Sequence, residues 1–471
     1  MTYSIAAPLR RTPRVSPRCP VPRRSASVLT AFLALLVVSD IGGARLEAQA
    51  LRDRLPELFI VSLAPGVLGS YRSADPANPA AGSVTTDVFA PGAQGANGQV
   101  LGFLLTWMNG TVASAPLGTT GAGVSFHFDQ GTPVESAVSR GPIFGEWGYT
   151  IGRGRFVAGL STNAVRYTSV RGTDMDRIGL NFTSRCAVDA ASCTSAEQGT
   201  ASDVLRMQLG VDLQLTTLSA YATVGVTNWL DVGVVVPGVR ADLEGRSSAE
   251  VLTLSPTPGA APTAFLSGTA AAPVRSATRS ISGNASGVGD VAARAKVALI
   301  RRSTYGIALV GEARFATGDE ADFLGSGANS VRGGLTYSAR ARATTPSITL
   351  GYLHWTEGPL NDAVLLTTGV DHVISPRAAV AVAFVSELQT GTSVFQVPSA
   401  VGVPTGSGGV GTTPIRPLEL PQVRDDAMHA SLGGRFTGPW GTGIIANVMV
   451  PVRRGGPRPD QVWTLGLERS F

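Results

Sequence analysis

The chain has 471 residues, of which 44% are hydrophobic and 15% charged, and its formal net charge is +5. Seven of the 38 basic residues and two of the 33 acidic residues lie in the first 50 positions, which leaves 31 of each in the remainder. A neutral remainder has no basic footprint, so no nucleic-acid partner is expected. No apolar run of 18 residues follows position 50, which excludes a helical membrane span.

The first 50 residues have the three parts of a secretory signal peptide. Six arginines between Arg10 and Arg24 form a basic region, residues 28 to 38 are mostly apolar, and Ala48-Gln49-Ala50 is a small-x-small cleavage motif. The apolar stretch is shorter than the roughly 20 residues of a membrane-spanning helix. We therefore predict export, with the mature chain beginning at Leu51.

Residues 51 to 116 carry many prolines, glycines and alanines that break any periodic pattern. We predict a periplasmic or lumenal segment here, outside any barrel wall. A compact apolar run at 100 to 108 predicts a short helix against the mouth of a barrel.

The clearest pattern in the chain lies at 203 to 226. Between Leu205 and Leu215 every second residue is apolar, and this period of two predicts a strand with two different faces. From Leu218 onward the apolar residues occupy the even positions, which we interpret as a bulge near Thr216. At about 3.3 Å per residue the strand would span roughly 70 Å, far beyond a usual strand. A turn at 227 to 228 leads into a second alternating strand.

Similar alternation predicts about fourteen strands, with a range of about 12 to 16. They lie at 121 to 128, 143 to 151, 155 to 169, 203 to 226, 229 to 243, 288 to 300, 305 to 316, 331 to 341, 346 to 355, 364 to 373, 378 to 388, 427 to 437, 443 to 450 and 461 to 471. Short turns alternate with long connections at 170 to 202, 244 to 287 and 389 to 426. This layout is typical of an all-β, antiparallel, up-and-down transmembrane β-barrel. We predict such a barrel over residues 117 to 471, in the lipid of the outer membrane.

The last predicted strand ends on an aromatic residue. Its apolar face holds Trp463, Leu465, Leu467 and Phe471, with polar or small residues between them. This pattern resembles the terminal signal by which the barrel-assembly machinery recognises outer-membrane proteins, although Arg469 stands where that signal usually has an apolar residue. We therefore predict that this face is both lipid-facing wall and assembly signal.

Two cysteines remain after the signal peptide, Cys186 and Cys193, in one polar and alanine-rich segment. The compartment outside the inner membrane favours oxidation, so we predict a disulfide within the loop. A metal pair would need two further ligands, and none is near in the sequence.

Three short clusters resemble a known family. Residues 287 to 290 read Gly-Val-Gly-Asp, residues 317 to 319 read Thr-Gly-Asp before Leu-Gly-Ser-Gly, and residues 227 to 232 read Thr-Asn-Trp-Leu-Asp-Val. Together they resemble the outer-membrane transporters grouped with the phenol meta-degradation pathway, which are distantly similar to FadL-type channels. The family usually has Leu-Pro where this chain has Phe315-Ala316. The resemblance implies passive uptake of small molecules, among them hydrophobic or aromatic compounds.

Charged residues alternate with apolar ones in the strands 288 to 300 and 305 to 316. If the apolar face contacts lipid, the charges point into the lumen, because a charge on the lipid face costs about 2 to 4 kcal/mol at the midplane. Two interpretations remain open, a selectivity lining or a salt-bridged filler of a narrow barrel. With two residues from the polar face of strand 203 to 226, the lumen-lining candidates are Arg206, Asp212, Arg294, Lys296, Glu312 and Arg314.

Motifs for catalysis or metal binding are weak. His429 and Ser431 lie two apart on one strand face, but no carboxylate is placed to orient the imidazole, so we predict no enzyme. Asp319, Glu320 and Asp322 could bind a cation, but their spacing matches no calcium loop and an ordinary solvated loop explains them as well. No metal or cofactor is predicted.

Two functions from different classes stay open. The first is a channel or transporter for passive uptake of small solutes across the outer membrane. The second is a non-conducting surface barrel whose long loops bind partners.

Overall fold

A computed structural model describes residues 50–59, 67–71, 84–85, 89, 125–129, 132–136, 146–189, 191, 193, 198–256, 263–269, 272–357, 361–393, 396–405, 411–439, 442–453 and 455–471. These all belong to the second of two units, Met1–Gln49 and Ala50–Phe471. Neither the signal peptide before Ala50 nor the short helix expected at 100 to 108 falls within them. Among the described residues, no helix is long and apolar enough to cross a membrane.

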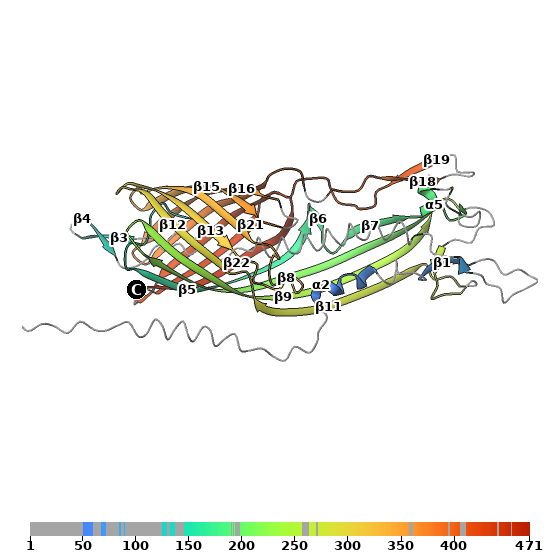
Figure 1. Ribbon diagram of the computed structural model, residues 1–471, viewed down its shortest axis with the longest axis horizontal. Helices are drawn as coiled ribbons and strands as arrows, with labels where there is room; N and C mark the ends of the chain where they lie inside the picture. The colour runs from blue at the N-terminus through green and yellow to red at the C-terminus, as the bar shows by residue number, and fades with distance from the viewer. Residues whose placement is uncertain are drawn as a thin grey trace, which may run out of the picture. The chain divides into compact units, whose positions relative to one another are not determined.

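Twelve antiparallel strands close into a barrel (Figure 1). The last strand pairs with the first, so no edge remains in the ring. In spatial order the strands are β5 (Phe156–Val170), β8 (Asp203–Gly225), β9 (Leu230–Thr253), β12 (Ala292–Arg301), β13 (Tyr305–Arg314), β14 (Ser330–Ala339), β15 (Thr344–Trp355), β16 (Ala363–Ser375), β17 (Ala378–Gln389), β20 (Ala427–Thr437), β21 (Thr442–Pro451) and β22 (Pro457–Ser470).

The barrel has two strands fewer than the expected number of about fourteen, and both differences lie before residue 155. Within 121 to 128 the structure has β3 (Ser125–Asp129), which pairs with β4 (Thr132–Ser136) in a separate two-stranded sheet. The described part of 143 to 151 is no strand, although Trp147, Tyr149 and Ile151 alternate as a lipid face would. All three side chains are buried. The closing partner of β22 is therefore β5.

Turns of two to four residues join strands at one end of the barrel, after β8, β12, β14, β16 and β20. We call this the short-turn end. Longer connections join strands at the other end, and three of them hold further structure. These elements are β6 (Thr173–Asp174), β7 (Ile178–Thr183), α5 (Arg185–Val188), β10 (Thr263–Phe265), β11 (Ser276–Val288), β18 (Val401–Thr405) and β19 (Gly411–Ile415).

Beyond the long-connection end, β8 and β9 run on as a sheet extension that also includes β7 and β11 (Figure 1). Much of the expected loop at 244 to 287 is therefore strand. Its Ser-, Gly- and Ala-rich composition lacks the apolar alternation that marks a membrane strand. Nearby lie α2 (Leu51–Arg54), β1 (Leu68–Tyr71) and β2 (Val84–Thr85), and β10, β1 and β2 form a three-stranded sheet.

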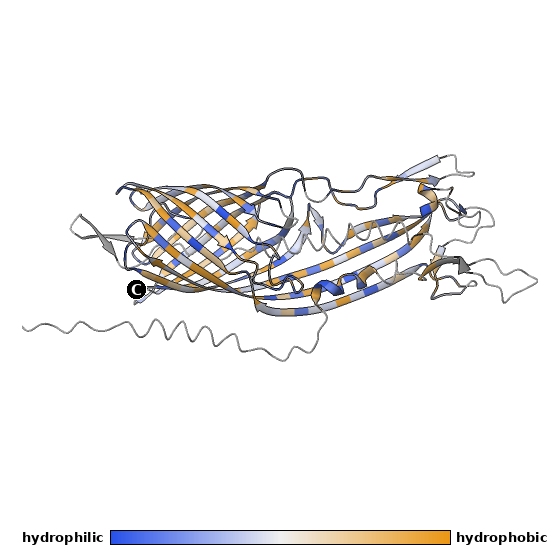
Figure 2. Ribbon diagram, viewed as in Figure 1, coloured by the Kyte–Doolittle hydropathy of each residue, from blue (hydrophilic) through white to orange (hydrophobic). Residues whose placement is uncertain are grey.

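The register of β8 against β9 is continuous from Asp203↔Thr253 to Gly225↔Asp231, so the expected bulge near Thr216 is wrong. In the barrel, the even-numbered Leu218 is exposed and the odd-numbered Ser219 is buried; in the extension, odd-numbered Leu213 is buried. Even-numbered side chains of β8 point outward along the whole strand, but the outside is lipid around the barrel and solvent around the extension. In the lipid the apolar face points outward, whereas beyond the lipid it points inward as in a soluble protein. Figure 2 shows the alternation along these strands.

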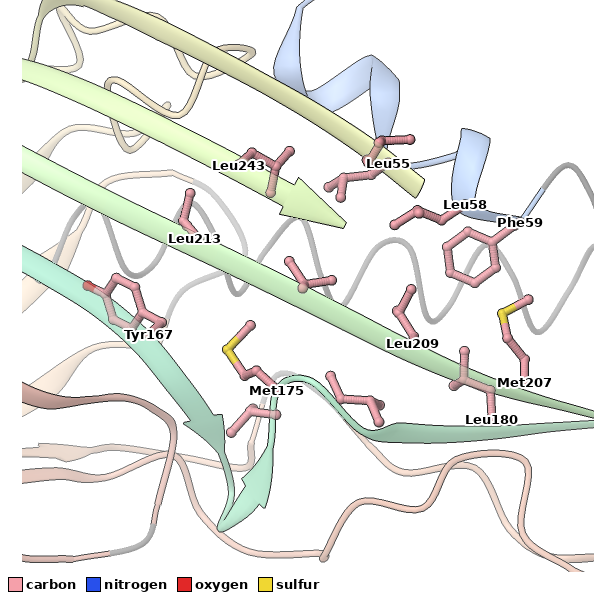
Figure 3. Packing of buried hydrophobic residues seen from close by; sticks show 14 of the residues in the cluster. Leu55, Leu58, Phe59, Tyr167, Met175, Leu180, Met207, Leu209, Leu213 and Leu243 are labelled. Atoms are coloured by element: carbon pink, nitrogen blue, oxygen red, sulfur yellow. The ribbon is translucent and has the colours of Figure 1, made fainter. Parts of the chain in front are cut away.

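The inner face of the extension forms the main hydrophobic cluster (Figure 3). Leu209, Leu213 and Leu243 of the long strands face Leu55 and Leu58, which follow α2. Burial of each leucine contributes about 1.5 to 3 kcal/mol relative to exposure. The amino-terminal residues of the described unit are therefore an integral part of the extension.

Candidate functional site

The outside of the twelve-stranded wall is apolar. Large hydrophobic side chains on the outward positions are about half exposed, and include Leu160, Leu218, Leu309, Leu335, Leu350, Val382, Leu432, Ile444 and Leu465. A closed sheet that pairs its backbone groups and presents such a belt is suited to hydrocarbon on its outer side and polar surroundings inside. The chain is an outer-membrane β-barrel.

A cluster of charges lies on the lumenal side of three adjacent strands. Cross-strand pairing sets Arg294 of β12 opposite Glu312 of β13, and Glu312 opposite Arg332 of β14. Arg294 forms an ion pair with Glu312, and Arg332 Nε lies 3.1 Å from Glu312 Oε1. Arg314, two residues along β13, places Nη2 3.8 Å from the same carboxylate. One carboxylate therefore joins three guanidinium groups.

Most of these charged side chains are buried, whereas Arg332 is partly exposed. Glu312 and Arg314 are 5% and 4% exposed, and Lys296 is 8% exposed. Lys296 forms an ion pair with Glu146, and Glu387 of β17 interacts electrostatically with Arg314 and Arg332. A buried charge without a partner costs free energy. Replacing one charged residue of the cluster would leave its partners unpaired and would strongly destabilise the folded barrel.

A second group of inward polar side chains lines the other side of the barrel. Arg435 of β20 forms an ion pair with Glu468 of β22, and the Tyr221 hydroxyl of β8 lies 3.4 Å from that carboxylate. Ser431 donates to Asn447 Oδ1 at 2.7 Å. Both sides of the lumen therefore present polar groups at membrane depth.

Residues 146–151, which we name the lumenal strap, lie along the inside of the wall before β5. Gly148 N donates to Ser338 Oγ of β14 at 2.9 Å, and Ile151 N donates to Asp231 Oδ2 of β9 at 2.8 Å. A Cβ built on Gly148 would overlap the carbonyl oxygen of Gly306 in β13, so only glycine fits there. The strap therefore narrows the lumen.

Four of the six lumen-lining candidates lie together in the charged cluster on β12 and β13: Arg294, Lys296, Glu312 and Arg314. Arg206 and Asp212 do not line the lumen. Arg206 is exposed, and Asp212 pairs with the exposed Arg166 on the outward face of β8. Both precede the position where the apolar and polar faces exchange, so the polar side of the strand points to solvent there.

Sequence reasoning missed Glu146, Arg332, Glu387, Arg435 and Glu468. Arg332 and Glu387 lie on predicted strands, at positions that alternate with outward apolar residues, so the same parity rule could have found them. Glu146 also alternates with Trp147, Tyr149 and Ile151, so the same rule would have placed it inward, although its segment is not a wall strand.

The remaining candidates lie away from the lumen. Cys186 and Cys193 are joined by a disulfide with Cα atoms 5.8 Å apart. On β22 and at the residue that follows it, four outward side chains are more than half exposed: Trp463, Leu465, Leu467 and Phe471. Phe471 N donates to Phe156 O at 2.8 Å, so the last residue takes part in closing the barrel.

His429 and Ser431 both lie on β20, and Ser431 is engaged with Asn447. No carboxylate hydrogen bond to His429 is present among the described residues, so this pair forms no triad there. The described part of the chain also holds no group of three or more residues suited to a metal ion.

No protein-family model and no curated protein sequence matches the chain. Among solved structures it is similar to an outer membrane channel from Pseudomonas putida F1, with 11% identity, a TM-score of 0.38 and coverage of 69% of this chain and 97% of that one. A Pseudomonas aeruginosa FadL homologue has 10% identity, a TM-score of 0.30 and coverage of 69% and 97%. A TodX mutant monoaromatic hydrocarbon channel has 9% identity, a TM-score of 0.30 and coverage of 67% and 88%. The barrel and its location rest on the geometry of this chain.

Proposed function

We propose that the chain is an outer-membrane channel for the passive uptake of small molecules. The observation that carries the proposal is the charged cluster on the inner wall, centred on Glu312 and its three guanidinium partners. Buried ion pairs contribute little to stability compared with well-packed apolar residues. A solute path uses charged groups on its wall to select what passes.

The polar lining also favours a class of solute. A molecule that enters loses water and must find hydrogen-bonding groups on the wall in exchange. Aromatic cargo, which the resemblance to the phenol-associated transporters implies, would then carry hydroxyl or carboxylate groups that the Arg294 and Arg332 side chains can bind. Plain hydrocarbons gain no such partners.

The lumenal strap narrows the proposed path. It is tied to the wall through Lys296 with Glu146, and through Trp147 with Asp371. Both contacts are made by side chains. A substitution that changes one of these charges, or an anion that competes for Lys296, would therefore release the strap from the wall.

Single-channel recording in planar bilayers tests the proposal. The wild-type protein is expected to conduct, and Lys296→Glu should shift its ion preference toward cations. The double variant Lys296→Glu/Glu146→Lys restores one charge of each sign and should recover the wild-type preference. Arg206→Glu is the matched control, because it reverses an equally sized charge on the solvent-exposed face of β8.

The second candidate is a non-conducting surface barrel whose long loops bind partners. The same ion pairs favour it, since paired charges and a strap can fill a narrow lumen. No conductance above protein-free bilayers, together with unchanged solute uptake in a deletion strain, would establish this alternative and exclude the channel.

A further inference from the structure

The acidic connection between β13 and β14 holds the start of the described chain. Leu51 N donates to Asp322 Oδ1 at 3.1 Å, and Arg52 N donates to Ala321 O at 2.9 Å. The Arg52 guanidinium forms an ion pair with Glu320. The acidic residues that looked suited to a cation in the sequence are therefore engaged by the chain itself.

Further contacts seat the same segment on β11. Arg54 donates to the carbonyl oxygen of Ser282, and Glu57 lies 3.0 Å from Arg279. Leu51 and Leu55 are only 2% and 0% exposed. The position of the Leu51 nitrogen is thus fixed by packing and by several polar contacts.

The Leu51 nitrogen belongs to the peptide bond that the small-x-small motif marks for cleavage. Hydrolysis breaks the Ala50–Leu51 bond and consumes one water molecule. The carboxylate leaves with residue 50, and the Leu51 amine takes up a proton to become an α-ammonium. A neutral donor with one hydrogen is thereby replaced by a cation with three.

We propose that the connection 319 to 322 is the docking site for the processed amino terminus, with Asp322 as the counter-ion of the Leu51 α-ammonium. The proposal rests on cleavage after Ala50 and is independent of whether the barrel conducts. The Leu51 N–H already donates to a carboxylate, and processing adds a positive charge on the donor, so the hydrogen bond becomes an ion pair as well. Removal of the signal peptide therefore strengthens the seating of the segment that covers the hydrophobic cluster of the extension.

Labelling of primary amines can measure this contact, because few other amines compete for the reagent. The sequence has one lysine, Lys296, so the mature protein would carry two primary amines. Lys296 lies in the lumen as the partner of Glu146. An amine-acylating reagent applied to the folded protein, followed by cleavage after glutamate, reports labelling of Leu51 in the peptide 51 to 57.

Because only the unprotonated amine reacts, a nearby carboxylate slows labelling near neutral pH. Relative to wild type, Asp322→Asn should increase Leu51 labelling by about threefold to tenfold, the range for a partly exposed ion pair. Asp322→Glu should keep most of the protection. Asp319→Asn is the matched control, because the Asp319 side chain accepts from the backbone of Ala321 instead.

Labelling of the unfolded proteins should be equal in all variants. Equal labelling of folded wild type and Asp322→Asn across the pH series would overturn the docking site. An amino terminus at any residue other than Leu51, determined by mass spectrometry of the membrane-extracted protein, would overturn it as well.

Discussion

Trp147 Nε1 donates a hydrogen bond to Asp371 Oδ2 at 2.9 Å inside the barrel, and both side chains are buried. The donor belongs to the lumenal strap, and the acceptor belongs to β16. On its other flank the strap is held by Asp231 of β9. The strap is thus fixed from two sides of the ring, and its position depends on two carboxylates.

Trp147→Phe should loosen the lumenal strap. The variant keeps an aromatic ring but removes the donor, and loss of a hydrogen bond to a charged group costs about 1.5 to 3 kcal/mol. We expect more frequent or larger openings in single-channel recordings. Trp463→Phe, on the lipid-facing side of β22, is the control. Openings identical to wild type in Trp147→Phe would mean that the strap does not limit conduction.

Asp290 should be the most sensitive residue of the long-connection end. It accepts from Gly318 N at 3.1 Å and from Ser326 N and Oγ at 2.8 Å and 2.6 Å, which binds two connections together. Asp290→Ala removes the acceptor from the buried Ser326 N–H and the half-buried Gly318 N–H, and should destabilise the folded barrel by about 2 to 4 kcal/mol. Urea unfolding in lipid vesicles measures this loss. Asp319→Ala should change little by comparison.

Asp203 should make the extension more stable at acidic pH. Burial raises the pKa of this carboxyl above its usual range, although hydrogen bonds from Thr253 and Thr263 act against the shift. The folded state therefore holds the proton more tightly than the unfolded state, and the stabilisation is lost as pH rises through the folded pKa. Limited proteolysis at a series of pH values should reveal this trend, and Asp203→Asn should remove it. A trend that persists in Asp203→Asn but disappears in Asp242→Asn would contradict the assignment.

Cys186 and Cys193 should resist alkylation in the exported protein until it is reduced. Their sequence separation is 7, and closure of so short a loop reduces the unfolded-state entropy by an amount worth about 2 to 3 kcal/mol. Replacement of both cysteines by serine should speed proteolysis within 171 to 202 and leave the barrel intact. Thiol labelling of both residues without reductant would rule out the bridge in the cell.

Deletion of Phe471 should reduce the amount of assembled barrel more than its burial predicts. The side chain is 65% exposed, so its packing contributes only part of the about 1.5 to 3 kcal/mol of a fully buried phenylalanine. We propose that the barrel-assembly machinery reads this residue with the apolar face of β22. The yield of heat-modifiable protein in outer-membrane fractions measures the effect. Phe436→Ala, also outward and exposed, serves as the control for lost lipid contact.

Periodicity predicted the wall well, because each lipid-facing strand must alternate to satisfy the bilayer and the lumen at once. Positions such as Arg294 and Glu312 could be placed inward from that rule alone. The same rule failed at Trp147 and Tyr149, since apolar alternation looks identical whether the apolar side meets lipid or packs inside the lumen.

The alternation of strand faces also led us to expect Arg206 and Asp212 in the lumen, where they do not lie. A residue on the polar face of a strand points inward only while the strand is inside the bilayer, and the sequence of one strand does not mark where it leaves. Which partners the cluster has is not written in any local pattern. Arg332 joins it through the register of β13 against β14, and Glu146 joins it because the lumenal strap lies beside Lys296.

The exchange of faces on β8 and β9 determines how deep the barrel can sit. The exchange occurs at the same height on both strands, because Leu218 lies opposite Gly238 and Thr216 lies opposite Arg240. Sinking by two residues, about 6 to 7 Å along the strand, would bring Arg240 into hydrocarbon, and rising by the same amount would place Leu218 in water. The exchange of faces on the wall itself therefore fixes the depth at which the barrel lies in the membrane.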